Sequence, residues 1–488
     1  MTRHLPILIV VLPLAGAVVV PVAGLLSGRL ARGLSLGLLL FTHLFALGAL
    51  RVALQAGPWR YELGGWAPPW GIEYVIDGLG GGMAVLISFM GLLTGVYAGP
   101  SLRQRSGLQA AVFHALHLLL TAGLLGIVVT GDAFNLYVFL EISALAAYAL
   151  LSGGGDRAAV AAFRYLLVGT IAASFYLLGI GYLYAATGTL NMADLAARLG
   201  GSAPPAIVAT AVALVVVGLA IKTALFPLHG WLPDAYAYAP TPAVSFISAS
   251  MSKVGVYVLL RFLFFILPAE GVADRVLDLL SLTAAIAVVA GSVMALAQSD
   301  LRRMLAYSSI GQMGYIVMGL GLGNAAALVG ALLHVVNHAV MKSCLFMVSG
   351  NVQHRAGTWA IAGYAGMGRR LPLTMAAFVV ASLSMIGLPP TGGFFSKWYL
   401  VLGALERGAW PYVLAIVTSS LLTAVYMFRV IEVAYLRPAK PEDAPRAEAP
   451  PAMLAPTLVL ALGVVALAVF NQSLVEGVLR PALAGVGR

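Results

Sequence analysis

The chain has 488 residues, of which 61% are apolar and only 9% are charged. A soluble domain carries roughly 25% charged residues, so this composition excludes a soluble globular protein, a disordered chain and a disulfide scaffold. The net charge is +10, and in so apolar a chain it indicates basic loops beside a membrane, with no nucleic acid as partner. The single cysteine, Cys344, lies in an apolar run, where it can form neither an internal disulfide nor a thiolate metal cluster.

Apolar segments long enough to cross a bilayer recur along the whole chain. A spanning helix needs about 20 mostly apolar residues, and no long polar insertion separates the segments. We therefore predict an all-α polytopic membrane protein with about 14 spans in a single membrane domain, residues 1–488. The expected spans are 5–26, 34–54, 76–98, 109–130, 132–151, 160–186, 205–226, 243–267, 276–297, 301–322, 325–350, 371–400, 411–436 and 452–470.

The loops between these spans indicate an orientation. If the N-terminus faces outward, the cytoplasmic loops hold 13 Lys and Arg residues and the outer side holds 8. Because cytoplasmic loops are enriched in Lys and Arg, we expect a multi-pass protein of the inner (cytoplasmic) membrane with both termini on the outer side. Residues 189–200 are amphipathic and predict a short helix at the membrane interface.

Proline interrupts two of the spans. Pro227 lies at the end of the seventh span, and Pro389 and Pro390 lie inside the twelfth. Proline removes a backbone donor and clashes with the preceding turn. The carbonyl groups freed at membrane depth then need water, ions or neighbouring side chains.

The two breaks lie five spans apart, which predicts an internal repeat. A first five-helix unit would cover residues 109–267 (spans 4–8), and a second would cover residues 276–436 (spans 9–13). An odd number of spans per unit inverts the second copy. Paired broken helices in inverted repeats indicate a transport site, and two ordinary proline kinks are the alternative.

Ionisable side chains inside the spans are functional candidates, because a charge at membrane depth costs several kcal/mol. Four of the five lysines lie in spans. Glu141 lies ~15 Å into its helix, near the midplane, and Lys222 comes five residues before Pro227. Each would lose its charge without a partner. We therefore predict that Glu141 and Lys222 pair, either as a switch that controls proton release or as a purely structural ion pair.

A second group of candidates lies in the eighth and eleventh spans. Lys253 lies about ten residues into the eighth span, among serines that include Ser248. His334, His338 and Lys342 follow one another at intervals of four residues and so share one helix face. Because histidine titrates near neutral pH, two histidines and a lysine in line favour a proton relay over a purely structural role. The HxxxH spacing has neither an HExxH motif nor a third ligand, so we expect no metal.

The remaining candidates lie at the breaks. Lys397 follows the second break and is expected either to exchange protons with one aqueous side or to extend toward the membrane surface. His229 and Asp234 lie in the first break, where they either link Lys222 to Lys253 or cap helix ends. No nucleotide-binding pattern or thiolate cluster is present, so we expect no cofactor and no enzyme active site.

Five motifs together resemble those of a known family of membrane subunits. They are GDAFNLYVFLEIS (131–143), IKTALFPLHGWLPDAYAYAPTP (221–242), SASMSKVGVY (248–257), HVVNHAVMK (334–342) and GLPPTGGFFSKWYL (387–400). On these motifs the chain is similar to the antiporter-like subunits shared by Mrp-type multisubunit cation/proton antiporters, complex I and membrane-bound hydrogenases, and most similar to the D subunit of the Mrp type. The resemblance covers essentially the whole chain, and residues 131–400 carry it most strongly.

The resemblance implies a role for several of the buried charges. It implies that Glu141 and Lys222 form the coupling pair, that Lys253 is a central proton carrier, and that Lys397 is a terminal exchange site. Some family members carry a histidine shortly before the lysine of span eight. This chain has Ile247 and Ser248 there, so a relay would need Ser248, His229 or water.

From these observations we expect a proton-translocating subunit of a multisubunit Na⁺/proton antiporter, with other subunits, the lipid bilayer, protons and monovalent cations as partners. The alternative is a proton-pumping subunit of a complex I-like NADH/quinone oxidoreductase or of a membrane-bound hydrogenase. A third class is a scaffold protein without transport activity. The buried lysines argue against it, because each lowers stability and a scaffold has no use for them.

Overall fold

The computed structural model describes residues 4–102, 106–200, 204–267, 271–438 and 447–484. Both chain ends, for which the sequence predicts an outer location, lie outside these ranges. So do six of the basic residues counted for the orientation: Arg3, Arg103, Arg105, Lys440, Arg446 and Arg488. The orientation of the chain in the membrane stays a prediction.

Helices make up nearly all of the described chain. Twelve of them are long and apolar enough to cross a membrane: α1 (Leu5–Leu26), α2 (Gly28–Ala56), α3 (Gly78–Ser101), α4 (Gly107–Val129), α5 (Ala133–Ser152), α6 (Asp156–Thr187), α8 (Pro205–Lys222), α10 (Thr241–Arg261, continued to Ile266 by the π-helical turn η3, Phe262–Ile266), α11 (Val272–Leu296), α13 (Ala325–Ala356), α17 (Trp410–Leu436) and α18 (Pro451–Val469).

Two further helical segments lie where the sequence predicts the other two of its fourteen spans. One is α12 (Leu301–Leu322), which is less apolar because it contains Gln312 and several serines, tyrosines and glycines. The other is the pair formed by α15 (Pro372–Ile386) and α16 (Gly392–Glu406). The prediction of an all-α polytopic membrane protein is therefore confirmed.

The remaining elements are short. They are the strands β1 (Trp59–Glu62) and β2 (Glu73–Ile76), the helices α7 (Met192–Leu199), α9 (Leu232–Tyr238), α14 (Met367–Arg370), α19 (Asn471–Leu474) and α20 (Arg480–Leu483), and the turns η2 (Leu63–Gly65), η4 (Ile361–Tyr364) and η5 (Val475–Leu479). The two strands form an antiparallel hairpin that pairs Trp59 with Ile76 and Glu62 with Glu73.

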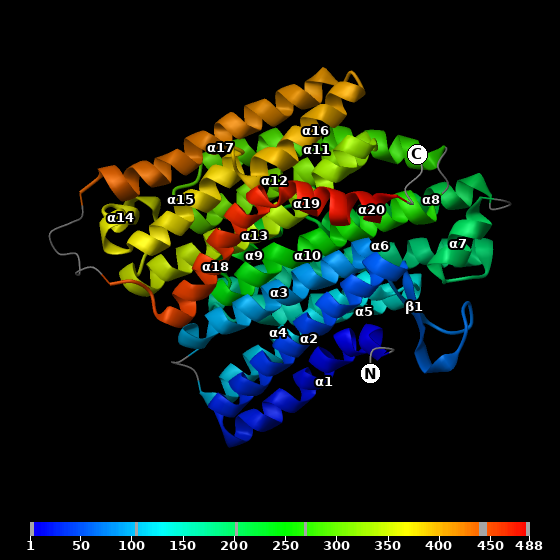
Figure 1. The fold of residues 1–488 in the computed structure, drawn as a ribbon, viewed down its shortest axis with the longest axis horizontal. Coiled ribbons are helices and arrows are strands. Elements are labelled where there is room, and N and C mark those ends of the chain that lie inside the picture. The colour runs from blue at the N-terminus through cyan, green and yellow to red at the C-terminus, as the bar shows by residue number, and fades with distance from the viewer. Residues whose placement is uncertain (1–3, 103–105, 201–203, 268–270, 439–446, 485–488) are drawn as a thin grey trace.

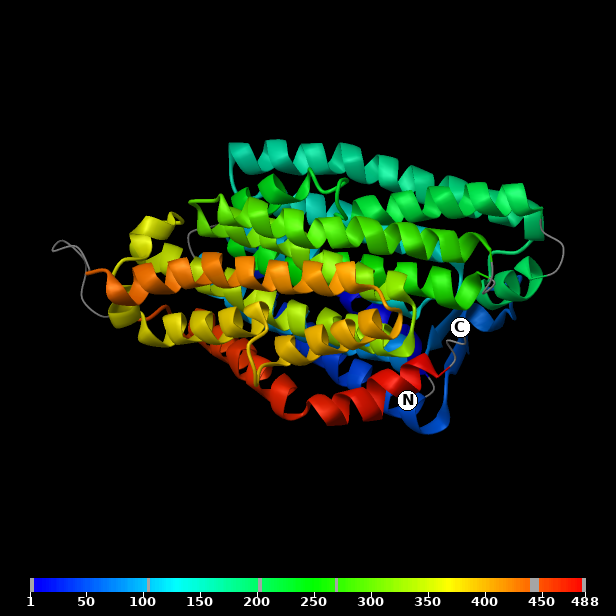
Figure 2. The ribbon, with the colours of Figure 1, turned by 90° about the horizontal axis from the view of Figure 1, so that it is seen from above.

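The long helices lie side by side in one bundle (Figures 1 and 2). α10 and α13 form its centre. In the apolar 18-residue stretch of each helix, 89% of α10 and 94% of α13 is buried, whereas the corresponding value for α2 is 28%. The β-hairpin, α7 and both ends of the described chain lie at one end of the bundle, and α14 lies at the other (Figure 1). A polar side chain on α10 or α13 is therefore shielded from lipid by other helices.

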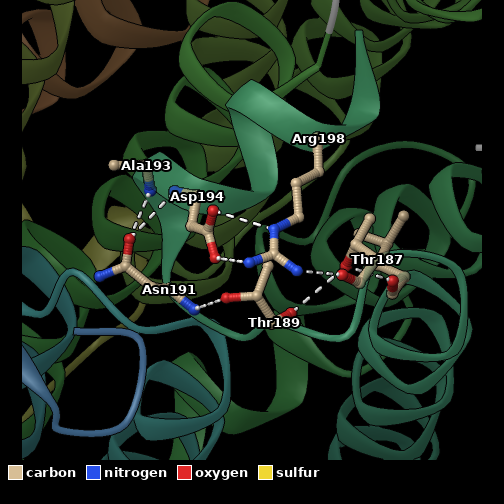
Figure 3. A network of polar contacts seen from close by, with 7 residues as sticks. Thr187, Thr189, Asn191, Ala193, Asp194 and Arg198 are labelled. Atoms are coloured by element: carbon tan, nitrogen blue, oxygen red, sulfur yellow. Dashed lines mark hydrogen bonds and ion pairs between the residues drawn. The ribbon is translucent and has the colours of Figure 1, made fainter. Parts of the chain in front are cut away.

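The amphipathic segment 189–200 contains the short helix α7, as the sequence predicts. Figure 3 shows how its first turn is held. Asn191 caps the helix by accepting from the backbone N–H groups of Ala193 and Asp194, each at 3.1 Å. Arg198 then closes the network by donating to the Asp194 carboxylate at 3.0 Å and to the carbonyl of Thr187 at 2.8 Å.

Both expected helix breaks are present. α8 ends at Lys222 and α9 begins only at Leu232, so the segment around Pro227 is irregular. α15 ends at Ile386, and α16 begins at Gly392, after Pro389 and Pro390. The helices α8, of 18 residues, and α15, of 15 residues, therefore each end at an irregular segment that contains proline.

Gly387 ends α15 with a φ of +88°, a conformation that a residue with a Cβ rarely adopts. At the first break, Trp231 donates from its indole nitrogen to the carbonyl of Ile221 at 2.9 Å. The carbonyl groups freed at the second break therefore lie beside Lys397, whereas at the first break the Ile221 carbonyl is occupied by Trp231.

Candidate functional site

The site begins with the expected pair on α5 and α8. The Lys222 ammonium lies 3.9 Å from the Glu141 carboxylate, which is an ion-pair contact but too long for a hydrogen bond. The Lys222 side chain is 5% exposed, and the Glu141 side chain is 29% exposed. Neither the Lys222 Nζ atom nor the Glu141 Oε1 atom has a hydrogen-bond partner among the described residues. The pair is thus held by charge rather than by a locked geometry.

Lys253 is fully buried at the centre of the bundle, on α10. Its ammonium donates to the backbone carbonyl of Ser248, one turn earlier on the same helix. Ser248 therefore contacts the lysine as the sequence suggests, but through its carbonyl and not through its hydroxyl. No carboxylate pairs with Lys253 among the described residues, so its charged form depends on this carbonyl and on more distant groups.

His334 and His338 are fully buried on α13. Their rings are stacked with centroids 6.0 Å apart. His334 is bound at both nitrogens, with Ser396 Oγ at 2.8 Å and Gln312 Oε1 at 2.9 Å. Neither ring nitrogen of His338 has a hydrogen-bond partner in the described part of the chain. No hydrogen bond to a described residue therefore fixes the orientation of this imidazole.

Lys342 lies on the same face of α13 but turns toward α12. Its ammonium donates to the Leu305 carbonyl at 2.9 Å and to Ser308 Oγ at 2.6 Å. It stays within electrostatic range of Lys253 and His338. Lys342 therefore has its hydrogen bonds to α12, and none to His338 or Lys253 among the described residues.

Lys397 lies on α16 beside the second break and is 5% exposed. Its ammonium donates to the Met385 and Ile386 carbonyls, the last two of α15, at 3.0 and 2.9 Å. It also donates to Ser420 Oγ at 3.0 Å and lies 4.7 Å from the centre of the Tyr315 ring. These contacts point Lys397 into the bundle, which excludes extension to the membrane surface in this conformation.

The two candidates in the first break lie apart from the lysines. Asp234 forms ion pairs with Arg303 at 2.8 Å and with Arg164 at 3.6 Å. His229 is partly exposed and stacks on Phe226, with ring centroids 5.2 Å apart. Among the described residues neither side chain has a hydrogen bond or ion pair with Lys222 or Lys253. Asp234 thus joins α9 to α6 and α12 through its two arginine partners. No direct contact supports a role for either residue in linking Lys222 to Lys253.

The buried groups follow the packing order of the helices. α10 packs against α5, α8 and α13, and α13 packs against α16. His338 lies within electrostatic range of Lys253, and His334 lies within range of both Lys253 and Lys397. The row thus runs across the bundle through helices that touch: Glu141, Lys222, Lys253, His338, His334 and Lys397.

Several residues that complete the site were not singled out from the sequence. Gln312, Tyr315, Ser396 and Ser420 each contact a member of the row. Asn337 is another, because it donates to the Gly392 carbonyl at 2.7 Å and so ties α13 to the second break. A single amide or hydroxyl in an apolar span is a signal that could have drawn attention to Gln312 and Asn337.

Comparison with known proteins agrees with this geometry. Residues 130–423 match the family model described as NADH:quinone oxidoreductase/Mrp antiporter, TM. This chain belongs to that family. The matched range contains both helix breaks and every member of the row, so the family resemblance predicted from the motifs is confirmed.

Relatives of the NADH:quinone oxidoreductase/Mrp antiporter family differ in how much of the chain they share. The N subunit of the NADH-quinone oxidoreductase of Desulforudis audaxviator is 53% identical over 99% of both chains. The D subunit of the Na(+)/H(+) antiporter of Alkalihalophilus pseudofirmus is 31% identical over 78% of this chain and 77% of its own. Among solved structures, a chain of the membrane-bound sulfane sulfur reductase, an archaeal respiratory membrane complex, is similar with a TM-score of 0.91 and 32% identity. The match covers 99% of this chain and 100% of that chain.

Proposed function

We propose that this chain is the proton-translocating antiporter-like subunit of a multisubunit membrane complex driven by redox chemistry. The observation that carries the proposal is the row of buried ionisable side chains on successive packed helices, from Glu141 to Lys397. Such groups are costly at membrane depth and are typical of proton pathways. Protons move along the row by successive changes in the charge of its lysines and histidines.

The Glu141–Lys222 pair serves as the control point of the row. While Glu141 stays near, its negative charge favours the protonated form of Lys222. When the carboxylate moves away, the buried ammonium is left without compensation and gives up its proton. The absence of hydrogen bonds at this pair among the described residues supports such a movement.

The exposure of Glu141 supports a partner subunit. Its side chain lies beside the exposed face of α5, which includes Phe134, Val138 and Leu145. A carboxylate that is 29% exposed in mid-span would face lipid if this chain were alone. We therefore assign the α5 face to contact with another subunit of the complex.

We also propose that residues 109–267 and 276–436 are the two inverted five-helix repeats. Each unit contains one broken helix with a lysine beside the break, Lys222 in the first and Lys397 in the second. This relation supports one half-site in each unit, with Lys222 at the end of the helix before its break and Lys397 in the helix after its break.

Sequence identity favours the redox-driven complex over sodium/proton antiport. The relative that shares 53% identity over the whole chain is named as the N subunit of an NADH-quinone oxidoreductase. The second candidate is a subunit of an Mrp-type Na⁺/proton antiporter, and the 31% identity to the D subunit of the Na(+)/H(+) antiporter supports it. The preference for the antiporter that the motifs suggested is therefore reversed.

Inside-out membrane vesicles that contain the complete complex test both parts of the proposal. Electron donor without sodium should drive proton uptake, and Lys222→Ala or Lys253→Ala should abolish it while the complex stays assembled. Proton movement that depends on a sodium gradient and not on the electron donor would favour the second candidate. Undiminished proton uptake in both variants would contradict the proposed pathway.

A further inference from the structure

Helix α15 begins without a capping side chain of its own. Its N-cap position is Leu371 and its first residue is Pro372, and neither offers a side-chain oxygen to the free N–H groups of the first turn. Glu448, far along the chain, supplies the missing acceptor. Its carboxylate accepts from the backbone nitrogens of Leu373 at 2.6 Å and Thr374 at 3.3 Å, and from the Thr374 hydroxyl at 2.7 Å.

Glu448 also contacts the end of α13. Its backbone carbonyl accepts from Arg355 Nε at 2.7 Å, in the last turn of the helix that carries His334 and His338. One residue of the segment that leads into α18 therefore ties the start of α15 to the end of α13.

The opposite end of α15 holds Lys397. The last carbonyls of this helix, at Met385 and Ile386, both accept from the Lys397 ammonium. A helix dipole favours an anion at its N-terminus and a cation at its C-terminus. α15 thus has Glu448 at its positive end and Lys397 at its negative end, ~22 Å apart along the 15-residue helix.

We propose that Glu448 is a positioning residue for Lys397. By holding the first turn of α15, it keeps the Met385 and Ile386 carbonyls against the ammonium and so sets how readily Lys397 releases its proton. This inference rests on the proposed function, because it assigns Glu448 to the same proton row.

The other titratable groups around Lys397 are Tyr315 on α12, His334 on α13 and Tyr426 on α17, which lies beside Tyr315. The sequences of α15 and α18 contain no titratable residue. In the described structure none of the three groups has a hydrogen bond or ion pair with Glu448. A change at Glu448 therefore reaches Lys397 through α15.

The test is the pH profile of proton uptake by the complete complex in inside-out vesicles. Glu448→Ala should lower the maximal rate, because the first turn of α15 loses the acceptor that holds it. It should also move the alkaline limb of the profile to lower pH, because the Lys397 ammonium loses acceptors. Glu448→Asp should restore both rate and profile. Glu432→Gln is the matched control, since Glu432 lies near the same end of the bundle and pairs with Arg437.

A wild-type rate and profile in Glu448→Ala would overturn the inference. A lower rate with an unmoved alkaline limb would also overturn it, because Glu448 would then stabilise α15 without affecting proton release from Lys397. If Glu448→Ala fails to assemble, Glu448→Gln replaces it. Glutamine keeps one of the two acceptor oxygens and loses the charge, so a smaller shift of the alkaline limb in the same direction is expected, and an unmoved limb would overturn the inference. Failure of the proposed function is distinguishable: the wild-type complex would then take up no protons, or Lys253→Ala would be fully active.

Discussion

The Lys222 ammonium lies 3.9 Å from the Glu141 carboxylate, and no hydrogen bond to a described residue fixes either of the two facing atoms. A permanent structural ion pair at membrane depth needs short, saturated contacts to offset the cost of burying two charges. The loose pair suits a contact that is made and broken during a transport cycle.

Glu141→Gln should therefore lower proton uptake on the order of 10²-fold, the contribution typical of one acid–base group. The glutamine keeps the size of the side chain and removes the charge that stabilises protonated Lys222. Proton uptake by vesicles that contain the assembled complex is the measurement. Asp156→Asn, an exposed carboxylate at the start of α6, is the control and should behave as the wild type. Equal rates in both variants would show that the pair has no role in transport.

Gln312→Leu should disturb the row at His334. It removes the Gln312 Oε1 acceptor, 2.9 Å from His334 Nε2, and leaves a buried imidazole nitrogen unpaired. The expected cost is about 1–3 kcal/mol of stability, with slower proton uptake. Gln298→Leu is the control, because Gln298 lies near a helix end and its side-chain amide donates to the Met294 carbonyl of the neighbouring turn, while its bond to Arg429 uses the backbone carbonyl, which the substitution keeps. Thermal unfolding of both purified variants checks the prediction, and an unchanged midpoint for Gln312→Leu would contradict it.

Arg261→Gln should destabilise the complex most at neutral pH and least in acid. Burial by itself raises the pKa of the Asp77 carboxyl, but the Arg261 guanidinium and the Gly80 N–H outweigh it and hold the pKa below its usual value. A lowered carboxyl pKa contributes stability above its unfolded value of about 3.9, and this contribution is lost as the pH falls through the folded value. Without the guanidinium, burial dominates and the folded pKa rises above the unfolded value, so the charged carboxyl destabilises the fold at neutral pH and this cost is relieved as the pH falls through the raised value.

The expected destabilisation by Arg261→Gln near neutral pH is on the order of 3 kcal/mol, because a partly buried carboxylate is left unpaired. Unfolding temperatures measured between pH 4 and 8 check this. Arg198→Gln is the control: Arg198 is 46% exposed and pairs with Asp194 within α7 (Figure 3), and so exposed an ion pair contributes little. Parallel pH curves for Arg261→Gln and the wild type would refute the assignment.

Gly291→Ala should separate α11 from α12. A Cβ at Gly291 would lie 2.5 Å from the backbone nitrogen of Gly311, closer than real contacts allow. The helices would have to move apart, at a cost of about 1–3 kcal/mol. Gly181→Ala on α6 is the matched control, because a Cβ there meets no atom within 4 Å. Unfolding temperatures of the two variants should differ, and equal values would contradict the close packing.

The spans, both breaks and the lysines could be predicted from the sequence because long apolar runs, prolines and buried charges are local signals. The partners of those charges could not, since they come from distant segments. Asp234 pairs with Arg164 and Arg303, not with a lysine. Hydropathy likewise could not predict that Glu448 caps α15, because this helix begins at residue 372, far from Glu448 in the sequence.

The most direct test of the central claim is to replace Lys253 by Arg and, separately, by Met, and to measure proton uptake by vesicles with equal amounts of assembled complex. Arginine keeps a positive charge at the centre of the row but does not release its proton, whereas methionine keeps only the apolar stem. If Lys253 carries protons, both variants should be inactive. Uptake at the wild-type rate in Lys253→Arg would show that only a fixed charge is needed there, and it would contradict the account.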